Sequence, residues 1–194
     1  MPADANDSSG LRMAVLVEGG LAVLAVVAAW LFDIQLREQL PDTRSELAAA
    51  VVRGVVATLP LVLALWLLVH VRWSAAQRLR QQAQRLIAEL FHRASLAQLA
   101  LVAVLAGVGE ELLFRGVLQT LVGRWTNDLS GLVVASLIFG LFHALSMLYF
   151  VLATLVGAYF GWLVLQYHDL TTVIIAHALY DFVALCYLRR DADN

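Results

Sequence analysis

The sequence has little charge, a single cysteine and no lysine. Only 14% of its 194 residues are charged, whereas a soluble domain carries about 25%. Hydrophobic residues make up 61% of the chain, which is the composition of a membrane protein. The lone Cys186 excludes an internal disulfide. With a net charge of -2 the chain has no basic footprint, so no nucleic-acid partner is expected.

The sequence contains long apolar runs. Since about 20 apolar residues cross a bilayer as a helix, the sequence predicts an all-α fold, a polytopic membrane bundle of about six transmembrane helices. The expected spans are Met13–Leu36, Leu47–Trp73, Ser95–Gly123, Leu129–Met147, Leu148–Gln166 and Thr171–Leu188. A re-entrant segment where the fourth span meets the fifth is the alternative count. In the fifth span, Gly157 and Gly161 have a spacing that permits close helix contact, unless they are ordinary membrane glycines.

The segment between the second and third spans is rich in arginine. Its apolar residues recur on one helical face, opposed by arginine and glutamine; they are Leu79, Ala83, Leu86, Ile87, Leu90 and Phe91. We predict an amphipathic helix at 74–94 that lies along the membrane surface, with a solvent-exposed or partner-binding helix as the alternative. Because this connection concentrates the arginines, the positive-inside rule predicts that it and both termini are cytoplasmic.

These features divide the chain into five parts. A polar tail is expected at 1–12, two transmembrane helices at 13–73, the amphipathic helix at 74–94, a functional core at 95–188 and a second tail at 189–194. The first tail lacks the positive region of a cleaved signal peptide, so the first span is expected to be retained.

Three charged residues lie inside the third span. Glu110, Glu111 and Arg115 interrupt an apolar helix, and each unpaired charge at the bilayer centre costs about 2.5–3.5 kcal/mol. Glu111 and Arg115 are four residues apart, which predicts an ion pair on one helix face. That pair leaves Glu110 available for chemistry. The alternative is that all three residues only bond neighbouring helices.

Two later spans carry the histidines. Phe139 and His143 are four residues apart, so the two rings share a helix face. His177 and Asp181 have the same spacing, which suits two metal ligands or a base with its orienting partner. A hydrogen-bonded interior histidine is the alternative for each pair.

Together these residues are suited to hydrolysis. Carboxylates and imidazoles from three helices could bind a divalent ion such as zinc, with ligands drawn from Glu110, His143, His177 and Asp181. Without a metal, Glu110 and His143 could polarise a water molecule. Either arrangement supplies a nucleophile for an amide bond, with His177 and Asp181 holding the metal or the developing oxyanion.

The three motifs resemble those of the CPBP family, the CAAX-protease and bacteriocin-processing intramembrane proteases, also called the Abi family. The matching residues are Glu110-Glu111-x-x-x-Arg115, Phe139-x-x-x-His143 and His177-x-x-x-Asp181. The resemblance implies that Glu110 and His143 activate water, that His177 and Asp181 assist or bind metal, and that Glu111 and Arg115 support them. Eukaryotic prenyl-protein proteases usually have asparagine at the position of Asp181, which puts an identical mechanism in doubt.

The resemblance also implies a location and a substrate class. The compact build looks like a bacterial inner-membrane protein, in which prenylated proteins are not expected. We therefore expect an endopeptidase that acts on a membrane-anchored protein or a peptide precursor within the lipid bilayer. A non-catalytic immunity or scaffold protein of the family is the alternative. A transporter is disfavoured because the first, second and fifth spans offer almost no polar groups.

Overall fold

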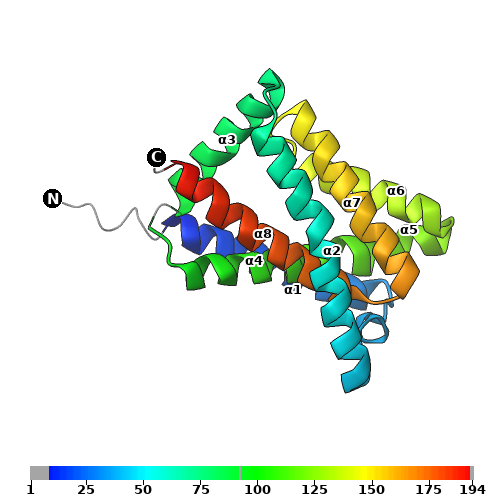
Figure 1. Ribbon diagram of the computed structural model, residues 1–194. Helices are drawn as coiled ribbons and strands as arrows, with labels where there is room; N and C mark the ends of the chain where they lie inside the picture. Colours follow the sequence, from blue (N-terminus) through cyan, green and yellow to red (C-terminus); the bar gives the residue numbers. More distant parts are fainter. Residues whose placement is uncertain (1–8, 92, 193–194) are drawn as a thin grey trace.

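The computed structural model describes residues 9–91 and 93–192, and these ranges are helical throughout apart from short connections (Figure 1). The α-helices are α1 (Ser9–Leu31), α2 (Arg44–His70), α3 (Ser74–Phe91), α4 (Leu96–Glu111), α5 (Thr120–Trp125), α6 (Asp128–Phe142), α7 (Met147–Tyr167) and α8 (Leu170–Ala192). A 3-10 helix, η1 (Leu36–Gln39), follows α1, and a π-helix, η2 (Leu112–Gln119), joins α4 to α5. The predicted all-α membrane bundle is confirmed.

The number of spans differs slightly from the prediction. Five helical stretches of the described chain are long and apolar enough to cross a membrane: Ser9–Leu31, Arg44–His70, Leu96–Trp125, Met147–Tyr167 and Leu170–Arg189. The predicted fourth span corresponds to α6, which has only 15 residues. At 1.5 Å per residue it measures about 22 Å, less than the bilayer's hydrocarbon core of about 30 Å. α6 is short because the chain turns at residues 143–146, after which the Ser146 hydroxyl caps α7 by accepting from the Tyr149 amide at 3.2 Å.

The predicted tails are shorter than expected. Residues 1–8 of the first tail lie outside the described residues, and α1 already begins at Ser9. α1 ends at Leu31 rather than Leu36, because Asp33 adopts a left-handed φ of 51° that breaks the helix. At the other end α8 continues to Ala192, and Arg189 donates a hydrogen bond to the Ala94 carbonyl before α4. Residues 193–194 also lie outside the described residues.

The amphipathic helix forms at α3, but its apolar face packs against the protein. Leu79, Ile87 and Phe91 are buried, and this face contacts Leu99 of α4 and Leu188 of α8. Figure 1 shows α3 running from the end of α2 toward the end of α8. The face covers the bundle, and the position of α3 along the membrane surface stays a prediction.

Glycines let α8 approach two helices closely. A Cβ added at Gly54 of α2 would lie 2.7 Å from the Ile175 Cβ. One added at Gly107 of α4 would lie 2.9 Å from the Ile174 carbonyl oxygen. Only a residue without a side chain permits these contacts. The acidic pair at the end of α4 is thereby held beside α8.

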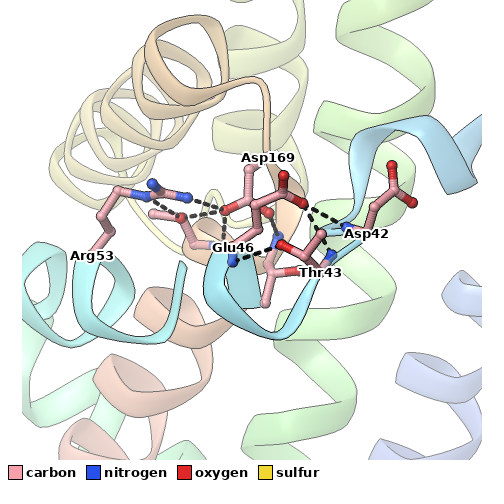
Figure 2. A network of polar contacts seen from close by, with 7 residues as sticks. Asp42, Thr43, Glu46, Arg53 and Asp169 are labelled. Carbon is pink, nitrogen blue, oxygen red and sulfur yellow. Dashed lines mark hydrogen bonds and ion pairs between the residues drawn. The ribbon is translucent and has the colours of Figure 1, made fainter. Parts of the chain in front are cut away.

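A polar cluster fixes the start of α8 against α2 (Figure 2). The Asp169 carboxylate accepts hydrogen bonds from the Thr171 amide at 2.8 Å and the Thr172 amide at 3.2 Å, so Asp169 caps α8. Arg53 donates to Asp169 at 3.1 Å and to the Thr172 hydroxyl at 3.2 Å. The second span is predicted to offer almost no polar groups, and Arg53 is an exception that has a structural role.

Replacing Asp169 with alanine should destabilise the bundle. The change removes the cap of α8 and leaves Arg53 without its carboxylate, which we expect to cost about 1–2 kcal/mol. For a chain of this size each kcal/mol lowers Tm by about 2–4 °C, measurable by circular dichroism in detergent.

Asp169→Asn and Asp42→Ala are the matched controls. Asn keeps the capping oxygen, so its loss should be smaller. Asp42 is an exposed acid in the same region (Figure 2), so its loss should have little effect on Tm. Equal shifts for Asp169→Ala and Asp42→Ala would contradict the assignment.

Candidate functional site

The two adjacent glutamates lie at the end of α4 and have different surroundings. Glu111 is completely buried, and Glu110 is 7% exposed. Successive residues of a helix point about 100° apart, so the two side chains serve different neighbours. The π-helix that begins at Leu112 follows directly, and π-helical segments are frequent at functional sites.

Glu111 connects an arginine to a histidine on another helix. Arg115 Nη1 donates to Glu111 Oε1 at 3.0 Å, which confirms the predicted ion pair. The same oxygen lies 2.7 Å from His177 Nδ1 on α8. Because the carboxylate accepts from both donors, Nδ1 carries a proton and the imidazole is held with Nε2 directed away from Glu111. Glu111 thus orients His177 in addition to pairing with Arg115.

Arg115 is fully buried and enclosed by aromatic rings. Its guanidinium carbon lies 4.3 Å from the centre of the Phe139 ring and 5.5 Å from that of Phe160, distances at which cation–π attraction acts. Its Nη2 donates to the Gly157 carbonyl at 3.1 Å. A Cβ added at Gly157 would come within 3.2 Å of that nitrogen. The predicted close contact at Gly157 is present, both with this side chain and with the Ser136 Cα of α6, which would lie 3.2 Å from an added Cβ.

His143 faces Glu110 from the end of α6. Its ring stacks on Phe139 with centres 4.4 Å apart, so the two rings share a face as predicted. Its Nδ1 lies 2.9 Å from the Phe139 carbonyl, which can only accept, so Nδ1 carries the proton. Nε2 lies 3.4 Å from Glu110 Oε2. His143 is predicted to lie inside a span, whereas in the structure His143 follows the last residue of α6.

Asp181 lies one turn beyond His177 on α8. Its Oδ2 is 3.4 Å from His177 Nε2, and its side chain is 29% exposed. His177 therefore lies between two carboxylates, the buried Glu111 and the more accessible Asp181. The Phe160 ring stacks on the imidazole with centres 5.3 Å apart. These contacts leave the Nε2 edge of His177 facing Asp181.

A cavity of about 500 Å³ contains the reactive groups. Glu110, His143, His177 and Asp181 all line it, together with apolar side chains of α1, α2, α3, α7 and α8. Glu111 and Arg115 lie behind this wall, fully buried. The structure therefore brings the predicted residues together around one space, with the ion pair as their support. Their catalytic roles stay a prediction.

Further polar residues on the cavity wall were missed. Glu18 of α1, Tyr149 of α7 and Tyr180 of α8 line the same cavity, as does Arg80 of α3. Glu18 also contradicts the statement that the first span lacks useful polar groups. An acid in the middle of an apolar span is a signal that could have identified Glu18. The two tyrosines give no such signal, because tyrosine is common in membrane helices.

The predicted metal site stays a prediction. Among the described residues, no group of three or more His, Cys, Asp or Glu side chains has an arrangement that could hold a metal ion. Glu111 contacts Nδ1 of His177, and the Phe139 carbonyl contacts Nδ1 of His143. These bonds leave Nε2 of His177 facing Asp181 and Nε2 of His143 facing Glu110.

Comparison with known proteins supports the resemblance seen in the motifs. Residues 92–183 match the model of the family described as "Type II CAAX prenyl endopeptidase Rce1-like". A Bacillus subtilis (strain 168) protein described as "Uncharacterized protein YpbD" is 32% identical over 104 residues. That alignment covers 52% of the chain and 51% of the relative, so the chain matches about half of that protein's length. No solved structure matches the chain.

The matched segment holds all three motifs. It begins just before α4 and ends within α8, so Glu110, Glu111, Arg115, His143 and His177–Asp181 all fall inside it. α1, α2 and α3 all lie outside it. Over residues 92–183, the chain is similar to the CAAX-protease family.

Proposed function

We propose that this protein is an intramembrane endopeptidase that hydrolyses a peptide bond of a membrane-associated protein or peptide precursor. One observation carries the proposal: the Glu110 carboxylate is buried in the cavity wall with Oε2 3.4 Å from His143 Nε2. A carboxylate and an imidazole at this separation can share a water molecule. The family match supports a protease.

Glu110 and His143 together would activate the water. Because Nδ1 of His143 donates to Phe139, the neutral ring offers Nε2 as an acceptor. Glu110 takes a proton from the water while His143 accepts its other hydrogen bond, and the oxygen attacks the peptide carbonyl carbon. Glu110 then returns the proton to the leaving amine as the carbon–nitrogen bond breaks. The scheme consumes one water and needs no other reactant.

His177, which lies between the Glu111 and Asp181 carboxylates, would act as an imidazolium, and its Nε2–H would stabilise the oxyanion that forms during attack. Glu111 and Arg115 fix the ring from behind, so its orientation is set before the substrate binds. A preorganised donor of this kind costs no reorganisation when charge develops. Asp181 would hold the Nε2 edge of the ring from the cavity side. In this scheme Glu111 and Arg115 are positioning residues.

We also propose the orientation and location of the chain. The arginines that flank and occupy α3 support a cytoplasmic position for this helix and for both termini. The composition and family support a multi-pass protein of a bacterial inner membrane. The substrate is then a membrane-anchored segment that reaches the cavity beneath α3.

Glu110→Gln should abolish cleavage without unfolding the protein. The amide cannot accept the proton of water, so we expect kcat to fall by about 10²–10⁴. The assay measures hydrolysis of a panel of labelled membrane peptides in liposomes that contain the purified protein. Tm should stay close to that of the unchanged protein, because Glu110 Oε2 makes no hydrogen bond within the described structure. Full activity in Glu110→Gln would overturn the proposal and favour a non-catalytic role.

Arg115→Met should destabilise the protein strongly. It leaves Glu111 buried without its cation, which we expect to cost about 3–5 kcal/mol. The double change Glu111→Gln with Arg115→Met removes both charges, so it should be more stable than Arg115→Met alone. Chemical unfolding of the unchanged protein, Glu111→Gln, Arg115→Met and the double variant in detergent measures the coupling. Purely additive losses would contradict the buried ion pair.

Activity should survive removal of metal ions. Water activation by Glu110 and His143 uses no metal, so protein dialysed against a chelator should keep its cleavage rate. Elemental analysis of the same sample, beside Glu110→Gln and His177→Ala, shows whether any ion remains. Loss of a stoichiometric metal together with activity would replace this scheme by a metal-dependent one.

A further inference from the structure

Glu18 is the acid of α1, and the residues from Met13 to Leu31 are otherwise apolar or glycine. Its neighbour Val17 is 51% exposed and Leu16 is 74% exposed, as expected of a helix facing lipid. Glu18 instead is only partly exposed and lines the cavity with Glu110 and Asp181. A charged residue in a membrane helix is costly and marks a functional position by default. The hydrolytic scheme above does not use Glu18.

Close contact of two backbones fixes Glu18 beside the reactive acid. A Cβ added at Gly109 of α4 would lie 2.5 Å from the Glu18 carbonyl oxygen and 3.2 Å from the Ala22 amide nitrogen. α1 therefore presses directly on the residue that precedes Glu110. The position of Glu18 is set by this contact rather than by its own side chain.

The part of the cavity near Glu18 and Glu110 is surrounded by more acidic than basic side chains. Four carboxylates belong to the cluster: Glu18, Glu110, Glu111 and Asp181. Arg115, His143 and His177 supply at most three positive charges, and Arg115 already pairs with Glu111. An additional cation would therefore be stabilised here.

Arg80 does not supply that cation. It lines the cavity from α3, but its Nη1 donates to the Val69 carbonyl at the end of α2 at 3.1 Å. The charged groups that act most strongly on Glu18 are Asp181 and His177. Arg80 thus serves the junction of α2 with α3.

A second observation points to a ligand at the acidic end. The Glu110 side chain is 9% exposed, and its Oε2 has no hydrogen bond within the described chain although it lines the cavity. Glu18 Oε2 is likewise buried without a hydrogen bond. Two such oxygens in one apolar space offer acceptors to a molecule that enters it.

We propose that Glu18 is a specificity-determining residue that binds a cationic side chain of the substrate, lysine or arginine, next to the bond that is cut. This inference rests on the proposed function. The apolar wall accepts the membrane segment of the substrate, and Glu18 with Asp181 accepts the ammonium or guanidinium group that accompanies it. A charge pair excluded from water favours the cationic substrate over a neutral one of equal size.

The test uses membrane peptides in phosphatidylcholine liposomes. The peptides are identical except for one residue, which is Lys, Gln or Glu and is scanned across the cleaved region. For the unchanged protein, kcat/KM for the best Lys peptide should exceed that for its Gln counterpart by about tenfold. Glu18→Gln should reduce this ratio to near one. Glu18→Arg should reverse the preference in favour of the Glu peptide.

Glu38→Gln is the matched control. It makes the same substitution at an exposed acid in η1, outside the cavity, so it should keep the preference for Lys. Tm of every variant shows that the bundle is intact. An unchanged Lys-to-Gln ratio in Glu18→Gln would overturn the inference. Equal slowing of all peptides would also overturn it, since it indicates a role in folding or in the chemical step.

Measurements of peptide binding test the role of Glu18 independently of the proposed protease activity. In Glu110→Gln, which should not cleave, fluorescence anisotropy measures Kd for the Lys and Gln peptides. The Lys peptide should bind about tenfold more tightly, and adding Glu18→Gln should remove the difference. If the unchanged protein cleaves no peptide, the protease proposal fails, yet the Kd ratio still decides the role of Glu18. A ratio near one in Glu110→Gln would refute cation recognition.

Discussion

The buried pair of Glu111 and Arg115 is the interaction on which this site depends. Neither residue is exposed, and a charge inside an apolar bundle persists only when it is paired and hydrogen-bonded. Arg115 donates from Nη1 to Glu111 and from Nη2 to the Gly157 carbonyl, and it has aromatic rings around it. Glu111 in turn fixes His177. One pair therefore joins η2, α7 and α8, and it sets the orientation of an imidazole without touching the cavity.

The two adjacent glutamates therefore have different roles. Glu111 is committed to structure, and its neighbour Glu110 is left at the cavity wall opposite His143. His143 lies at the end of α6, where its Nδ1 is held by the Phe139 carbonyl and its ring by the Phe139 side chain. Phe139 also contacts Arg115. Phe139 thus contacts a member of both the Glu110–His143 pair and the Glu111–Arg115 pair. A displacement of either pair therefore moves the ring that packs against the other.

Local spacing predicted the parts of the site that lie within one helix. The ion pair of Glu111 with Arg115 and the shared face of Phe139 with His143 follow from residues four apart. The end of α6, the π-helical turn and the packing of α3 depend on contacts between distant segments, so periodicity could not locate them. Amphipathicity correctly predicted α3 as a helix, but an apolar face does not reveal whether it covers lipid or protein. Glu18 was missed because a lone acid on α1 becomes part of the site only when α1 packs against Gly109.

The boundary of the family match has a consequence for substrate choice. The matched residues 92–183 contain the groups proposed to activate water and to stabilise charge. Much of the cavity wall comes from α1, α2 and α3, which lie before this segment. Hydrolytic chemistry needs a fixed geometry, whereas recognition needs only complementary shape and charge. The helices before the matched segment can therefore differ between relatives without disturbing the reaction. An acid on α1, here Glu18, is then a means of selecting substrates.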